Sequence, residues 1–177
     1  MPKITGEQAT FLLDIFTDTI KRESVATRNV IAAIPADKGE YKPDECSKCS
    51  LELARHIAAA ERRLLSIPID GAFDPKAPSP LPESVKTPAE IAAWYAQSTT
   101  ETLDRLSRLT PEQLMRIVDF RGLVQMPAVM YVQFASNHSI HHRGQLSSYL
   151  RAMGSKVPAI YGESYDSAAA KKAAAGG

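Results

Sequence analysis

Apolar residues recur every three or four positions in four long segments of the chain, the spacing that places them on one face of a helix. The first segment covers residues 5–34 and is ended by Pro35. The second begins near Ser47 or Ser50, since either side chain can accept a hydrogen bond from a free backbone amide, and it continues to Pro68. The pattern therefore predicts two amphipathic helices in the first part of the chain.

The same spacing returns in residues 88–109 and 127–154. Thr87 and Glu90 have the spacing of a capping box at the start of the third predicted helix. Gly154 is typical of a helix end, because glycine readily adopts the left-handed backbone that closes many helices. Four amphipathic helices in one chain favour a four-helix bundle.

Two long connections separate these helices. Residues 69–87 are rich in proline and cannot be helical, and residues 110–126 form a second connection with one helical turn at most. No segment alternates convincingly between apolar and polar residues, so we expect no β-sheet. The sequence thus predicts an all-α protein with one domain over residues 1–166, followed by a low-complexity tail, residues 167–177, that we expect to be disordered.

The composition is that of an ordinary globular protein, with 177 residues, 44% apolar and 23% charged. The 21 basic and 20 acidic residues give a net charge of +1 and no basic patch suited to nucleic acid. No apolar run approaches the ~20 residues of a membrane helix. The first residues include polar and acidic side chains where a secretion signal needs an apolar core. We therefore expect a cytoplasmic protein that binds neither nucleic acid nor membrane.

Cys46 and Cys49 form a C-x-x-C pair. A zinc knuckle would need a second pair of cysteines or nearby histidines, and a thioredoxin-like redox pair would need a preceding strand. Neither context is visible around these cysteines. We interpret them as two small residues at the start of a helix.

Three of the four histidines, His138, His141 and His142, lie in the stretch NHSIHHRGQL. His138 and His142 are four residues apart, so both point to one face of the fourth predicted helix. This face is otherwise apolar, where an imidazole needs a partner. His56 lies on the apolar face of the second predicted helix, which antiparallel packing could bring opposite the pair. Three histidines with an open fourth position are typical of a catalytic metal site.

A simpler interpretation is that these are core histidines hydrogen-bonded to carbonyls or hydroxyls, and for His56 alone it would be preferred. The pair at ligand spacing together with one further inward histidine favours the metal site. His141 is turned about 100° from His142, and we expect it to pack beside the site or to support a ligand. Glu52, one turn before His56, could hydrogen-bond the free nitrogen of that ring, although a solvated carboxylate is the alternative.

Several common catalytic patterns are absent from the sequence. A peptidase of the H-E-x-x-H type needs glutamate directly after the first histidine, and Ser139 stands there instead. No nucleophile elbow, Walker loop or dinucleotide-binding fingerprint is present. The chain therefore offers no good nucleophile of its own.

Three stretches together resemble the DinB/YfiT-like family of metal-binding four-helix bundles. They are NHSIHHRGQLSSYLRAMGSKVPAIYGESYD, VIAAIPADKGEYKPDECSKCSLELARHIAAAE and DFRGLVQMPAVM. The resemblance implies an up-up-down-down bundle that holds a divalent metal, often nickel or zinc, through His56, His138 and His142. It also implies a homodimer.

Family resemblance further implies a thiol-dependent transferase or isomerase, so we expect a metal-dependent S-transferase that joins a low-molecular-weight thiol cosubstrate to a small electrophile in stress or detoxification. A metal lowers the pKa of a bound thiol, and the protein then needs only to orient it. Arg143 could bind a carboxylate of thiol or substrate, and Asn137 and Gln145 could orient ligand or water. The alternatives are a surface salt bridge for Arg143 and helix packing for the two amides. The competing functions are a metal-dependent hydrolase and a non-catalytic metal-binding protein of the stress response.

Overall fold

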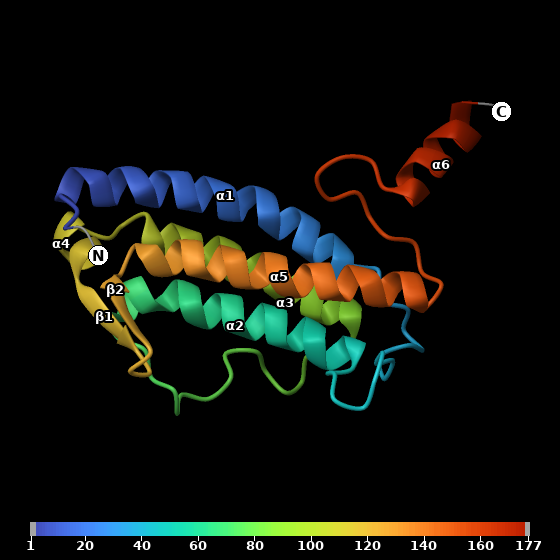
Figure 1. Ribbon diagram of the computed structural model, residues 1–177, viewed down its shortest axis with the longest axis horizontal. Helices are drawn as coiled ribbons and strands as arrows, with labels where there is room; N and C mark the ends of the chain where they lie inside the picture. The colour runs from blue at the N-terminus through green and yellow to red at the C-terminus, as the bar shows by residue number, and fades with distance from the viewer. Residues whose placement is uncertain (1–2, 176–177) are drawn as a thin grey trace.

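A computed structural model describes residues 3–175 as a bundle of four long helices with a short helix and a hairpin at one end (Figure 1). The elements in chain order are α1 (Gly6–Ala32), α2 (Ser50–Asp70), α3 (Pro88–Leu106), α4 (Pro111–Met115), β1 (Ile117–Phe120), β2 (Val124–Pro127), α5 (Met130–Ala152) and α6 (Tyr165–Ala175). The all-α bundle predicted from the sequence is confirmed. None of the helices in residues 3–175 has the length and hydropathy that a membrane crossing requires.

Each long helix packs against two neighbours. Helices α2 and α5 make the most extensive contact, and α1 and α3 complete the square. Two apolar clusters fill the interior, one at each end of the bundle. Between them, the facing middles of α2 and α5 carry the half-buried histidines.

The order of helix directions differs from the predicted up-up-down-down. The start of α1 packs with the end of α2, the end of α3 and the start of α5, so the directions are up, down, down and up. The reason lies in the connections. Residues 33–49 turn back at one end of the bundle, whereas residues 71–87 run along its whole length and return the chain to start α3 (Figure 1). Residues 107–129 stay at one end, so the bundle has one long crossover instead of the two expected.

Side chains of α2 hold the long crossover by its backbone. Arg55 donates to the carbonyls of Val85 and Pro82, and Arg63, two turns further on, donates to those of Ala77 and Pro78. Each guanidinium satisfies carbonyls that a proline-rich segment cannot pair within itself. The crossover is therefore fixed against α2 although it contains no helix.

The prediction of no sheet is wrong at residues 117–127, where β1 and β2 pair as an antiparallel hairpin. The strands have four residues each, too short for a period of two to stand out. Leu123 donates its backbone amide to the Phe120 carbonyl across a tight turn. The central residues Arg121 and Gly122 have φ of 61° and 71°, the signs a type I′ turn requires.

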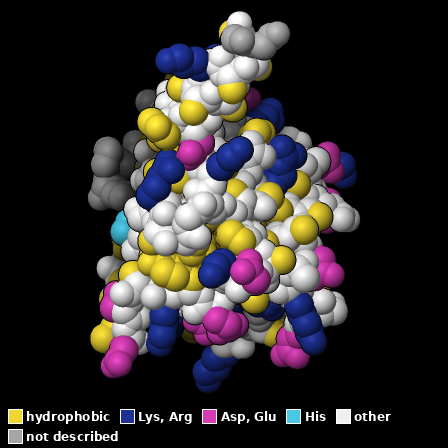
Figure 2. Space-filling model, turned by 90° about the vertical axis from the view of Figure 1, so that its right-hand side faces the viewer, with side chains coloured by type: hydrophobic (Ala, Val, Ile, Leu, Met, Phe, Trp, Pro, Cys, Tyr) yellow, Lys and Arg dark blue, Asp and Glu magenta, His cyan; other side chains and the backbone are white. Residues whose placement is uncertain are grey.

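The C-terminal segment also departs from the expectation of a disordered tail. Residues 165–175 form α6, consistent with the high helix propensity of alanine, but none of its residues is buried. It projects from one end of the bundle, where basic and acidic side chains are interspersed (Figure 2). Residues 176–177 of the predicted tail lie outside the described range.

Candidate metal centre

Helices α2 and α5 bring three histidines together. His56, His138 and His142 each offer one ligand atom, and these atoms lie within 4.8 Å of one another. The ring centroid of His56 lies 5.0 Å from that of His138 and 4.6 Å from that of His142. The centroids of His138 and His142 are 4.4 Å apart. The pair on α5 meets because residues four apart share a helix face. His56 joins it because α2 runs antiparallel to α5.

A hydrogen bond to a neighbouring side chain orients one of these rings. The Nδ1 of His142 bonds the side-chain oxygen of Gln145 at 2.7 Å, which leaves its Nε2 directed at the cluster, 3.2 Å from the Nε2 of His56. Such a bond to the far nitrogen is how metal-binding histidines are commonly held. The Nδ1 of His138 is buried without a hydrogen-bond partner. Gln145, predicted to orient ligand or water, therefore orients a histidine.

Burial keeps these imidazoles neutral. It is the main cause of a lowered pKa at His56, His138 and His142, and the neighbouring histidines add to the effect; at His138 the pKa falls to about 4. Neutral imidazole is the form that binds a metal ion. Three neutral nitrogen donors with one unpartnered buried nitrogen fit a divalent ion of the zinc, nickel, copper or iron group.

The lowered pKa values predict that the metal-free protein becomes less stable as the pH falls from about 7 to about 4. Histidine in the unfolded chain has a pKa of about 6.5, above the pKa of folded His138. The unfolded state therefore binds more protons in this interval and gains relative stability. Thermal unfolding at a series of pH values would measure the slope. In a His138→Gln variant, stability should depend less steeply on pH than in the wild type. An unchanged dependence would contradict the lowered pKa of His138.

Other residues expected near the site have different positions. Glu52 is exposed, and its carboxylate accepts a hydrogen bond from the Cys49 amide at 3.0 Å, so it caps α2 and does not serve His56 in the way predicted. His141 is exposed and stacks edge-on against His142 at 4.8 Å. Asn137 is exposed on α5.

Arg143, which directly follows His142, points away from the histidines into a buried ion pair. Its side chain is 2% exposed and contacts the carboxylate of Glu23 on α1 at 2.6 Å. It also donates to the Glu23 carbonyl, to Thr27 and, at 2.6 Å, to the hydroxyl of Tyr161. Arg143 therefore ties α5 to α1 and to the C-terminal segment. It is not available to bind a substrate carboxylate, and its ion pair is buried and not on the surface, so both expectations for this residue are wrong.

Sequence reasoning missed Glu61, which is buried inside the bundle at 2% exposure. Its carboxyl accepts a hydrogen bond from Thr99 at 3.4 Å, and the Ser139 and Tyr95 hydroxyls lie close by. Burial raises the pKa of Glu61, opposed by these hydroxyls and by the charge of Arg143. Its position four residues after the inward Ile57 was the available signal.

Both cysteines lie apart from the histidine cluster. Cys46 is exposed, Cys49 is buried, and neither forms a disulfide. Cys49 is the residue that precedes the first turn of α2. Burial raises the pKa of the Cys49 thiol, which disfavours the reactive thiolate.

A cavity of about 510 Å³ opens beside the histidines, and His56 and His138 form part of its wall. Its other sides come from α2, the long crossover, the hairpin and α5, and three phenylalanines line it: Phe73, Phe120 and Phe134. This volume falls within the range of small-molecule sites.

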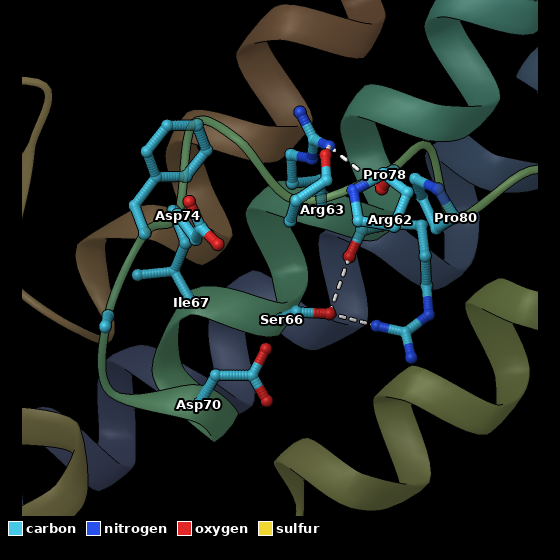
Figure 3. A pocket seen from close by; sticks show the side chains of 11 residues that line it. Arg62, Arg63, Ser66, Ile67, Asp70, Asp74, Pro78 and Pro80 are labelled. Carbon is cyan, nitrogen blue, oxygen red and sulfur yellow. Dashed lines mark hydrogen bonds between the residues drawn. The ribbon is translucent and has the colours of Figure 1, made fainter.

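A second hollow, of about 280 Å³, lies on the other side of Arg63 (Figure 3). Arg63, Phe73 and Pro80 line both spaces, so they form the shared wall. The Arg63 side chain reaches the crossover near Pro78, and Arg62 turns instead to Ser66 (Figure 3). His56 and His138 line the larger of these two spaces, and no histidine of residues 3–175 lines the smaller one.

The bundle and its three-histidine cluster define a helical protein with a possible metal site. The model of the DinB family matches residues 10–173, and the chain belongs to that family. YjoA of Bacillus subtilis is 30% identical over 130 residues, which cover 72% of this chain and 82% of YjoA. YrdA of the same organism is 28% identical over 152 residues, 85% of this chain and 88% of YrdA.

Solved structures show the same fold. The crystal structure of the DinB-like protein YjoA from B. subtilis superposes with a TM-score of 0.66 and 25% identity, covering 84% of this chain and 99% of that one. A DinB-like protein from Bacillus cereus gives a TM-score of 0.68 at 25% identity, covering 82% and 95% of the two chains.

Proposed function

We propose that the protein is a metal-dependent enzyme that transfers a low-molecular-weight thiol to a small electrophile. The observation that carries this proposal is the chemistry of the cavity next to the histidines. None of its lining residues, all within the described range, carries a carboxylate, and Glu52 is engaged at the start of α2. A site that activates water is favoured by a general base, whereas a site that binds a thiol needs none once the proton is lost.

The donor set suits this chemistry. A divalent ion held by His56, His138 and His142 would supply the positive charge that keeps a thiol deprotonated at neutral pH. Gln145 orients His142, and the phenylalanine-lined side of the cavity offers a surface that can position the electrophile. No side chain is required as a nucleophile.

Turnover of a chromogenic aryl halide by the zinc- or nickel-loaded protein tests the proposal. A carbon–sulfur bond forms and halide leaves, so we expect product only when a low-molecular-weight thiol is added, and none from a His142→Ala variant. A His141→Ala variant keeps the three facing histidines and should retain turnover.

The two alternatives give different results in the same assay. Hydrolysis of an activated ester without thiol would overturn the transferase in favour of the hydrolase. Full metal loading without turnover of any thiol tested would contradict it in favour of a non-catalytic metal-binding protein. The hydrolase is the weaker alternative because the cavity lacks a carboxylate.

A further inference from the structure

Arg121 occupies a backbone conformation that normally belongs to glycine or asparagine. Its φ of 61° places it in the left-handed region at the first central position of the hairpin turn. Gly122 beside it has φ of 71° with nothing within 4 Å of where a Cβ would stand. A long charged side chain kept at such a position is an outlier of the kind that accompanies ligand sites.

Arg121 is exposed and lines the same cavity as His56, His138 and the three phenylalanines. Within residues 3–175, its guanidinium makes no hydrogen bond and no ion pair with any carboxylate. Asp119, two residues earlier, is engaged instead with the Gly122 amide and the Gln125 side chain. Arg63, the other arginine of the cavity, donates to the carbonyls of the long crossover. Within the described residues, Arg121 is therefore the arginine of this cavity whose whole guanidinium is unpaired, whereas Arg63 has its Nη2 held by the crossover.

The cavity wall is aromatic as well as apolar. Phe120 lies between the other two rings, with its centroid 4.4 Å from that of Phe73 and 5.5 Å from that of Phe134. These rings come from three separate elements, β1, the crossover and α5. A planar apolar ligand can pack against such a surface, because aromatic rings favour offset and edge contacts.

We propose that this cavity binds an aromatic molecule carrying one anionic group, with Arg121 recognising the anion and the phenylalanines packing on the ring. A guanidinium offers a planar fork of donors that matches a carboxylate. The proposal rests on the proposed function only in taking this cavity as the place where the electrophile binds. It names the substrate class of that site: aromatic acids and not neutral aromatics.

Calorimetric binding of cinnamate and of its neutral amide, cinnamamide, tests the proposal on the zinc-loaded protein. Cinnamate should bind about 10-fold more tightly than the amide, and an Arg121→Gly variant should lose that preference. Glycine suits the left-handed position, so this variant should fold at least as stably as the wild type. A Phe73→Leu variant should weaken both ligands several-fold. An Arg28→Gln variant removes an exposed arginine of α1 that does not line the cavity, and it should bind as the wild type does.

A repeat of the measurement after zinc has been chelated separates this inference from the thiol-transfer proposal. Binding needs neither thiol nor turnover, so the preference for cinnamate should persist without metal even if no transfer is ever observed. A preference for cinnamate that persists in Arg121→Gly but is lost when zinc is removed would mean that the metal binds the carboxylate. That result would overturn the proposal. Equal binding of acid and amide by the wild type, or an unaffected Phe73→Leu variant, would overturn it too.

Discussion

A His138→Ala variant is expected to leave purification with only a small fraction of the metal that the wild-type protein carries. His138 provides one of the three nitrogen donors that converge within 4.8 Å, and two remaining imidazoles make a much poorer site. Loss of a partner that merely supports a ligand costs about 10–100-fold in affinity, so loss of the ligand itself should cost on the order of 100-fold or more. Elemental analysis of untagged protein, followed by titration with zinc or nickel, measures this effect.

The matched control is His141→Ala, which removes the neighbouring exposed histidine and leaves the cluster intact. It should retain wild-type metal content. Equal loss of metal from both variants would contradict the three-histidine site, and so would full retention by His138→Ala. Thermal unfolding without metal shows whether each variant is folded before the comparison is made.

A Glu23→Ala variant is expected to be severely destabilised. Arg143 is 2% exposed and Glu23 only 16%, so removal of the carboxylate leaves a buried guanidinium without its counter-charge. Breaking such a pair costs about 3–5 kcal/mol of the free energy of unfolding. Because Arg143 keeps its hydrogen bonds to Thr27 and Tyr161, the lower end is expected. For a chain of this size that corresponds to a fall of roughly 10 °C in Tm.

Two variants calibrate this measurement by chemical denaturation. Asp18→Ala removes an exposed partner of Lys21 on the same helix and should cost less than about 1 kcal/mol. Glu23→Gln retains an acceptor for Arg143 and should fall between the two. A Glu23→Ala protein as stable as Asp18→Ala would show that the buried pair is not needed for stability.

The helices and the histidine cluster were accessible from the sequence because both depend on local spacing. The apolar stripes and the capping box of Thr87 and Glu90 mark the long helices, and the structure has that capping box. His138 and His142 share a face by helix geometry alone. His56 needed one additional assumption, that α2 and α5 pack antiparallel, and the structure has this arrangement.

Features that depend on distant partners were not accessible. Arg143 and Glu23 are separated by 120 positions, and nothing near either residue indicates that they meet in the interior. The helix directions depend on how far residues 71–87 travel, which composition does not determine. The hairpin was missed because Arg121 occupies the first central position of its turn. An asparagine or glycine there would have been a recognisable signal.

The way in which Arg55 and Arg63 hold the long crossover has a consequence for how cavities of this kind can diverge. Both arginines bond main-chain oxygens, which every amino acid possesses, so these four contacts do not depend on the side chains of the segment. Substitution of residues such as Phe73 and Ser79 can then change the shape of one side of the cavity while these backbone contacts are kept. New ligand preferences should therefore arise more readily by substitution in the long crossover than in the helices.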